Sequence, residues 1–155
     1  AGLGERYLYE QLVAIRDGER VIAQMAGQVD NKTDQELADL AAYYDSFERS
    51  GGQADPELAE LGEKVYRAGV AERNVAACTS CHSPHGEGNG PAGFPALAGQ
   101  HAEYIEAQLK AYRLGYERPG EGRYTDGDAK IMRSNAFGLT DYEIRAVASY
   151  IAGLQ

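Results

Sequence analysis

Apolar residues recur at the spacing of an α-helix along most of this chain. Leu8, Leu12 and Ile15 lie on one face of a first helical stretch, and Gly18 marks its end. Residues 101–115 carry a second apolar stripe of the same kind. No stretch alternates apolar, β-branched residues with polar ones, as a strand with one buried face does. We therefore predict an all-α protein.

Capping residues mark the starts of three of the predicted helices. Residues 33–36 (TDQE) and 140–143 (TDYE) each place a glutamate three positions after a threonine, which is the pattern of a capping box. Another helix is predicted to begin with Asp55 as its N-cap and Pro56 in its first turn, and to end at Gly69.

An internal repeat relates the two ends of the chain. Residues 1–20 align with 98–117, with Tyr7 over Tyr104 and Gln11 over Gln108 among the matches, and residues 25–44 align with 132–151. Between these two matches the second copy contains an extra loop, roughly residues 117–127. The second half of a domain therefore occurs twice, whereas its first half, which holds the cysteines, occurs once.

The repeat predicts two units of unequal completeness. The stretch SGGQA, residues 50–54, has the composition of a linker. We predict a vestigial half-domain of two helices over residues 1–50 and a complete domain over residues 51–155. About fifty residues rarely form a stable core alone. The half-domain is therefore expected to pack on the following domain or on another subunit.

The charge of the chain limits its partners. Its 155 residues include 24 Asp and Glu against 15 Lys and Arg, for a formal net charge of −9. This sign repels nucleic acid and anionic membrane surfaces, so we expect no nucleic-acid partner. No stretch approaches the ~18 apolar residues of a spanning helix, so no membrane insertion is expected. Because no signal segment opens the chain, we expect a cytoplasmic protein or a mature form whose signal has been removed.

The stretch ACTSCHSPHG contains both cysteines of the chain, Cys78 and Cys81, followed directly by His82. A thiol–disulfide switch of the thioredoxin kind expects a βαβ setting, which the helical pattern lacks. A zinc site needs four ligands, and two of His82, His85 and His101 would complete the cysteine pair without the spacing of common zinc fingers. The third chemistry is covalent haem, for which C-x-x-C-H is the attachment signature.

We favour the haem interpretation. Both thiols would add to the haem vinyl groups, and His82 would lie under the iron as its proximal ligand. Met132, which we predict to lie on a loop before the last helix, is the methionine available as the second ligand in this domain. A His/Met pair raises the reduction potential and suits electron carriage. If Met132 does not bind, the open position would instead suit a haem enzyme or a gas sensor.

The segments CTSCH (78–82), GFPALAGQHAEYIEAQLKAYRLG (93–115) and IMRSNAFGLTDYEIRAVASYIAGL (131–154) resemble class I c-type cytochromes. The resemblance is strongest to the periplasmic di-haem family called cytochrome c-four, and it covers nearly all of residues 57–155. Residues 1–48 resemble the second half of that family's first domain. Members of the family contain two C-x-x-C-H motifs, whereas this sequence contains one, so we expect a single covalently attached haem c. Because the family carries electrons, we expect no enzymatic activity.

The resemblance also implies roles for individual residues. It implies axial ligation of the iron by His82 and Met132, with the carbonyl of Pro95 accepting a hydrogen bond from the other ring nitrogen of His82. That contact would orient the imidazole. Leu97 would line the haem as an apolar contact, and Gly99 because the backbone passes close to the haem there.

Other residues carry hypotheses of their own. Arg123 and Tyr124, in the longer loop of the second copy, would reach the haem propionates; the alternative for Arg123 is a solvated loop residue. Met25 occupies the repeat position of Met132. We expect it to be buried between two helices, the alternative being ligation of a partner chain's haem by domain swapping. The remaining tyrosines of the helical stripes are expected in the core or an interface: Tyr7, Tyr43, Tyr44 and Tyr104.

Together these features predict a periplasmic, monohaem c-type cytochrome that carries single electrons between a redox donor and an acceptor, such as a dehydrogenase and an oxidase. The alternative is a permanently bound haem subunit of an enzyme complex, such as the flavocytochrome c sulfide dehydrogenases. In that case the N-terminal half-domain would supply the contact with the enzyme subunit, or with a second copy of the chain.

Overall fold

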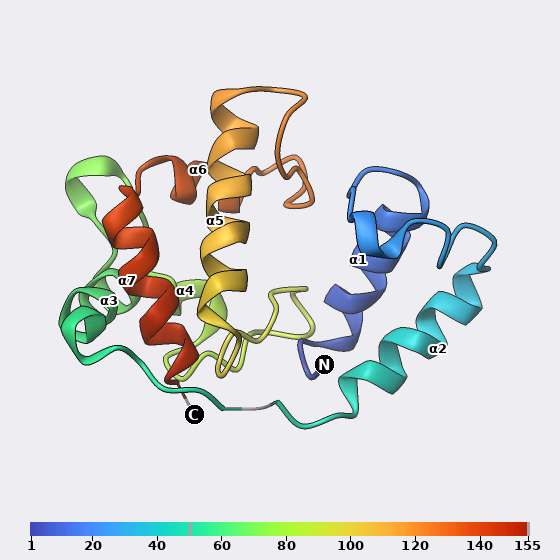
Figure 1. Cartoon of the computed structure of the whole chain (residues 1–155), viewed down its shortest axis with the longest axis horizontal. Coiled ribbons are helices and arrows are strands. Elements are labelled where there is room, and N and C mark those ends of the chain that lie inside the picture. The colour runs from blue at the N-terminus through green and yellow to red at the C-terminus, as the bar shows by residue number, and fades with distance from the viewer. Residues whose placement is uncertain (50, 155) are drawn as a thin grey trace.

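The structure, a computed structural model, describes residues 1–49 and 51–154 and is helical (Figure 1). Within these residues there is no β-strand beyond two isolated bridges, which confirms the predicted all-α fold. The α-helices are α1 (Glu5–Arg16), α2 (Asp34–Asp45), α3 (Pro56–Ala68), α4 (Thr79–His82), α5 (Ala102–Glu117), α6 (Ile131–Phe137) and α7 (Asp141–Ala152). Two short 3₁₀ turns cover Ala23–Met25 and Ala71–Arg73. In the described part of the chain, no helix has the length and apolar character needed to cross a membrane.

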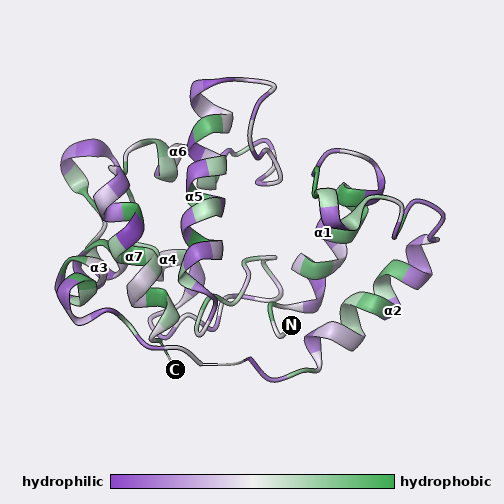
Figure 2. Ribbon diagram, viewed as in Figure 1, coloured by the Kyte–Doolittle hydropathy of each residue, from purple (hydrophilic) through white to green (hydrophobic). Residues whose placement is uncertain are grey.

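Residues 51–154 form the C-terminal unit, which is built around packed helices. Helix α7 packs against both α3 and α5, and α6 packs against α5. Hydrophobic and hydrophilic segments alternate along α5 and α7 in Figure 2, as expected for helices with one buried face. The apolar cluster of this unit consists of Val65, Tyr66, Val75, Ala98, Ile105, Leu109, Tyr112, Ala136, Leu139, Ile144, Val147, Ala148, Ile151 and Leu154.

Residues 1–49 form the N-terminal half, in which α1 packs against α2. Leu37 and Ala41 of α2 are completely buried in this contact region. Figure 1 shows the pair of helices beside the C-terminal unit, on the side away from α3 and α7. Residues 51–54 of the predicted linker are irregular, as expected, while Ser50 lies outside the described residues.

Of the four tyrosines predicted in the core or an interface, Tyr43 and Tyr44 do not lie in the core, and an interface for them stays a prediction. Their exposed fractions are 59% and 50%. Tyr43 aligns with Tyr150 of the second copy, and Tyr150 stacks on Tyr66 of α3 with ring centroids 5.6 Å apart. Tyr43 instead contacts Tyr44 and Phe47, and this face of α2 is exposed in the described chain.

Both predicted capping boxes are present. At the start of α7, the backbone N–H of Glu143 donates to Thr140 Oγ1 (3.3 Å), and the backbone N–H of Thr140 donates to Glu143 Oε2 (2.9 Å). Thr33 and Glu36 form the same pair of bonds at the start of α2. The N-cap of α3 is Asp55, whose carboxylate accepts from the backbone N–H of Glu57 (2.9 Å).

The capping box of α7 gives a testable prediction. Replacing Thr140 with alanine is expected to lower the free energy of unfolding by about 1 kcal/mol, because the N–H of Glu143 loses its acceptor. Guanidinium denaturation of the intact protein measures this change. The variant Thr140→Ser retains the hydroxyl and should stay close to the original stability; an equal loss in both variants would contradict the capping role.

Candidate functional site

The two cysteines and His82 lie on one short helical turn. Helix α4 covers Thr79–His82, with Cys78 as its N-cap, and the backbone N–H of His82 donates to the carbonyl of Cys78 (2.9 Å). Positions three and four apart share a face of a helix, so Cys78 is aligned with both Cys81 and His82. The two thiols are not joined in a disulfide.

His82 is held in one tautomer by the loop that follows it. Its side chain is buried, with 6% exposure, and Nδ1 lies 2.9 Å from the carbonyl oxygen of Pro95. Because a carbonyl can only accept, Nδ1 carries the proton and Nε2 keeps its lone pair. Burial lowers the pKa of His82, against the opposing effect of the Pro95 hydrogen bond. The result is a neutral, oriented imidazole of the kind that ligates a metal.

Close backbone packing brings Pro95 to His82. Gly88 has a φ of +77°, and its N–H donates to the carbonyl of His82 (2.9 Å). A Cβ on Gly88 would lie 2.6 Å from the backbone nitrogen of Ala96, so a side chain here would push the loop away. A second backbone hydrogen bond closes the same loop, because the N–H of Leu97 donates to the carbonyl of Gly86 (2.7 Å).

Met132 lies in the first turn of α6, and the prediction that it lies on a loop is wrong. Helix α6 starts with Lys130 in the left-handed conformation, which does not have the threonine–glutamate signature of the other helix starts. The helix is anchored by a buried ion pair in which Arg133 Nε lies 2.7 Å from Asp126 Oδ1. The backbone N–H of Arg133 also donates to Asp126 (2.9 Å).

Asn135 links α6 to the cysteine segment. Its Oδ1 accepts from the backbone N–H of Ala76 (2.8 Å), two residues before Cys78. Sequence reasoning missed Asn135 and the Asp126–Arg133 pair, because their partners become neighbours only in the folded chain. Half-buried Cys78, Leu97 and Met132 all pack against the apolar cluster of the C-terminal unit.

Gly99, predicted to line a haem, has a φ of +69° and its N–H donates to the carbonyl of Ile151 (3.3 Å). The loop therefore lies against the end of α7 at this point. Met25 is half-buried in the 3₁₀ turn Ala23–Met25 rather than enclosed between two helices, contrary to the expectation.

Arg123 is buried, with 7% exposure, so the alternative of a solvated loop arginine is wrong. Its guanidinium donates to Gln108 (2.6 Å) and to two residues of the N-terminal half, Gln11 (2.7 Å) and Tyr7 (2.8 Å). These bonds and one to Thr125 use four of its five N–H groups. The hydroxyl of Tyr124 donates to the carbonyl of Arg118 (3.0 Å). The propionate roles of Arg123 and Tyr124 stay predictions.

The other chemistries considered for the cysteines fit this geometry less well. Burial raises the pKa of the Cys78 thiol to about 11, which disfavours the thiolate that a disulfide switch or a zinc ion needs. Among residues 1–49 and 51–154, no three His, Cys, Asp or Glu side chains gather as the ligands of a metal ion would. His85 and His101 are exposed, as expected for surface residues.

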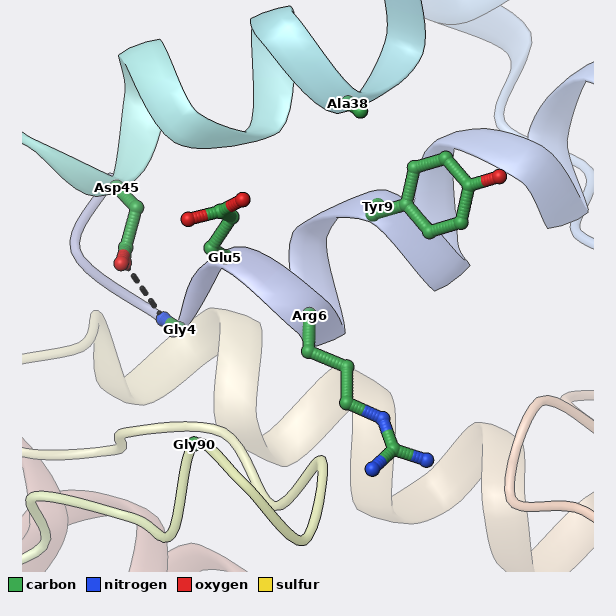
Figure 3. Close-up of a pocket in the computed structure, with 7 residues that line it drawn as sticks. All are labelled: Gly4, Glu5, Arg6, Tyr9, Ala38, Asp45 and Gly90. Atoms are coloured by element: carbon green, nitrogen blue, oxygen red, sulfur yellow. Dashed lines mark hydrogen bonds between the residues drawn. The ribbon is translucent and has the colours of Figure 1, made fainter. Parts of the chain in front are cut away.

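A hollow of about 470 Å³ lies between the N-terminal half and the loop around Gly90 (Figure 3). Figure 3 shows Arg6 and Tyr9 projecting from α1, and the backbone N–H of Gly4 bonded to Asp45 (2.7 Å). None of the predicted site residues lines this open hollow.

The residues around α4 fit a covalently attached haem. Two unjoined thiols lie three positions apart, a buried imidazole has a free Nε2 lone pair, and a thioether packs on the same apolar cluster as Cys78. A model of the family described as Cytochrome c matches residues 59–155. The chain belongs to the cytochrome c family. Membership implies a covalently bound haem c and the carriage of electrons.

Individual cytochromes extend the match to the N-terminal half. The chain is 47% identical to cytochrome c4 of Azotobacter vinelandii over 99% of its own length and 75% of that protein. Its structure superimposes on the crystal structure of reduced recombinant cytochrome c4 from Pseudomonas stutzeri with a TM-score of 0.93, over 100% of this chain and 83% of that chain. The two sequences are 45% identical. It is also 37% identical to a thiosulfate dehydrogenase electron acceptor of Thiomonas intermedia, over 98% of this chain and 68% of that protein.

Proposed function

We propose that this cytochrome carries single electrons in the periplasm, with one haem c attached through Cys78 and Cys81 and ligated by His82 and Met132. The observation that carries the proposal is the hydrogen bond between His82 Nδ1 and Pro95, because it leaves Nε2 of a buried neutral imidazole free to bind iron. When bound, haem supplies a one-electron Fe(III)/Fe(II) couple whose potential its axial ligands tune.

The chain's own residues would hold the haem and exclude water from it. Leu97 packs on the apolar cluster and would cover one haem face, while Gly99 would let the haem lie beside its backbone. The Asp126–Arg133 ion pair, 3% and 11% exposed, would keep Met132 in place in both oxidation states. Fixed ligands and an apolar surround lower the reorganisation that accompanies electron transfer. Arg123 would use its remaining N–H toward the propionates, whereas Tyr124 would first have to release its hydrogen bond to the carbonyl of Arg118.

As a carrier, this cytochrome would have no catalytic residues, and its partners would be a donor and an acceptor protein that meet the haem edge transiently. We also propose the division into a haem-less half over residues 1–50 and a monohaem domain over residues 51–155. The single C-x-x-C-H supports one haem for this sequence.

A second candidate is a cytochrome held by an enzyme, as an acceptor for a dehydrogenase. The similarity to the thiosulfate dehydrogenase electron acceptor favours it. The exposed aromatic side chains of Tyr43 and Tyr44 on α2, and of Phe47 just after it, also favour it, because they contact one another at the surface. Sedimentation of the purified cytochrome, alone and with a candidate dehydrogenase, separates the two. A stable complex that survives dilution would support the enzyme-bound form.

The optical spectrum tests the proposed ligands directly. We expect sharp c-type bands after reduction with dithionite, one haem per chain, and the weak far-red methionine–iron(III) band in the oxidised protein. A c-type spectrum without the far-red band would rule out Met132 as ligand and favour an open or differently ligated iron. A colourless protein would rule out the haem itself.

A further inference from the structure

Arg20 and Arg123 occupy equivalent places in the two copies of the repeat. The backbone N–H of Arg20 donates to the carbonyl of Ala14 (2.8 Å), and that of Arg123 donates to the carbonyl of Ala111 (2.9 Å). Ala14 and Ala111 are matched positions in the repeat. The longer loop of the second copy shifts Arg123 along the sequence, so the two arginines do not align there. The fold returns Arg123 to the place that Arg20 holds in the first copy.

The side chain of Arg20 reaches across to the second copy. Its Nη1 donates to Gln11 of its own copy (3.0 Å). Its Nη2 donates to the hydroxyl of Tyr104 (2.9 Å) and to Gln108 (3.4 Å), both on α5. One guanidinium thus bonds to the glutamine of its own copy and to the tyrosine and glutamine of the other.

Arg123 makes the same contacts with the copies exchanged. Its Nη1 donates to Gln108 of its own copy (2.6 Å), and its Nη2 donates to Tyr7 (2.8 Å) and Gln11 (2.7 Å) on α1. The two arginines, two tyrosines and two glutamines therefore form a reciprocal clamp with approximate two-fold symmetry. The clamp joins the N-terminal half to the C-terminal unit through α1 and α5.

The clamp holds two positive charges without a carboxylate. Within the residues that the structure describes, Arg20 and Arg123 form no ion pair, and their partners are amide, phenol and hydroxyl oxygens. Nearby Arg133 does have a carboxylate partner, Asp126. A buried charge without a counter-charge is costly. No protein carboxylate of the described residues therefore neutralises the positive charge of the clamp.

The charge of Arg123 contacts one ring of the apolar cluster on which the proposed haem-binding residues pack. The guanidinium carbon of Arg123 lies 4.6 Å from the centroid of the Tyr112 ring. Tyr112 belongs to the apolar cluster against which Cys78, Leu97 and Met132 pack. One aromatic ring therefore connects the charge to the cluster around the site, in a region where charges act through a low effective dielectric constant.

We propose that the Arg20–Arg123 clamp raises the reduction potential of the haem and makes the N-terminal half part of the redox unit. This inference rests on the proposed function, since it requires a haem attached beside the cluster. One-electron reduction lowers the net charge of the site by one, so nearby positive charges favour the reduced form. Arg123, which is buried and lies over the Tyr112 ring of the cluster, should contribute more than half-buried Arg20.

Spectroelectrochemical titration of the haem-loaded full chain tests the proposal, with redox mediators supplying one electron per iron. In Arg123→Gln, the ratio of reduced to oxidised protein at a fixed ambient potential should fall by about threefold or more. Arg20→Gln should produce a smaller fall in the same direction. The matched control is Arg145→Gln, which removes the same charge from an exposed position over Tyr142 on α7 and should change the ratio little.

A charge-preserving variant separates charge from shape. Arg123→Lys keeps the positive charge but lacks the planar guanidinium whose N–H groups reach Gln108 and Tyr7 together. Its reduction potential should therefore stay closer to the original than that of Arg123→Gln. Equal potentials for Arg123→Gln and Arg145→Gln, or an equal fall in the lysine and glutamine variants, would overturn the inference. Failure of the proposed function is distinguished beforehand, because the unmodified chain would then show no c-type spectrum.

Discussion

Replacing Met132 with alanine is expected to abolish the far-red band of the oxidised protein and to let carbon monoxide bind the reduced protein. The thioether packs on the same cluster as Cys78, and alanine has no atom that can ligate iron. Loss of this soft ligand should also lower the reduction potential by a substantial part of the about 0.8 V that axial ligands span. Optical titration with and without carbon monoxide measures all three changes.

Met25 provides a control within the same chain. It aligns with Met132 in the repeat, but it lies half-buried in the 3₁₀ turn Ala23–Met25, away from the cluster on which Cys78 and Met132 pack. Met25→Ala should therefore keep the far-red band and exclude carbon monoxide. Retention of the band in Met132→Ala, with its loss in Met25→Ala, would reverse the assignment of the ligand.

Replacing Gly62 with valine is expected to lower the free energy of unfolding by about 3 kcal/mol. Gly62 lies at the crossing of α3 and α7, where a Cβ would come within 2.3 Å of the carbonyl oxygen of Ala146 and 2.6 Å of Tyr150 Cβ. The backbone of α7 would have to move, and the contact of Tyr150 with Tyr66 would be disturbed. Guanidinium denaturation, followed by helical circular dichroism, measures the loss.

The matched variant Gly90→Val places the same side chain in open space, with no heavy atom within 4 Å of the added Cβ. It should change stability by less than about 0.5 kcal/mol, as surface substitutions usually do. Equal destabilisation by both valines would mean that the α3–α7 crossing has no special need for glycine.

Helices with strong local signals were predictable from sequence. The Thr33 and Thr140 capping boxes and the Asp55 cap all appear where expected, because each depends on side chains within three residues of the backbone they bind. The attachment motif was readable for the same reason, since Cys78, Cys81 and His82 are brought together by one turn of helix.

Helix α6 could not be predicted from local sequence signals. It lacks a capping signature and follows a glycine-rich loop, and its position depends on Asp126 and on the contact between Asn135 and Ala76, 59 residues apart in the sequence. Sequence patterns gave no indication of these partners. Met132, which its chemistry singles out as a candidate ligand, was therefore placed in the wrong local structure.

The sequence by itself determined the all-α class, the cap positions, the C-x-x-C-H motif and the repeat, because these depend on spacing along the chain. Only the tertiary structure decided the surroundings of side chains that meet across long separations. It exposed Tyr43 on α2, and it buried Arg123 against α1. The reciprocal clamp belongs to this second class, since its two arginines become equivalent only when the longer loop folds back onto α5.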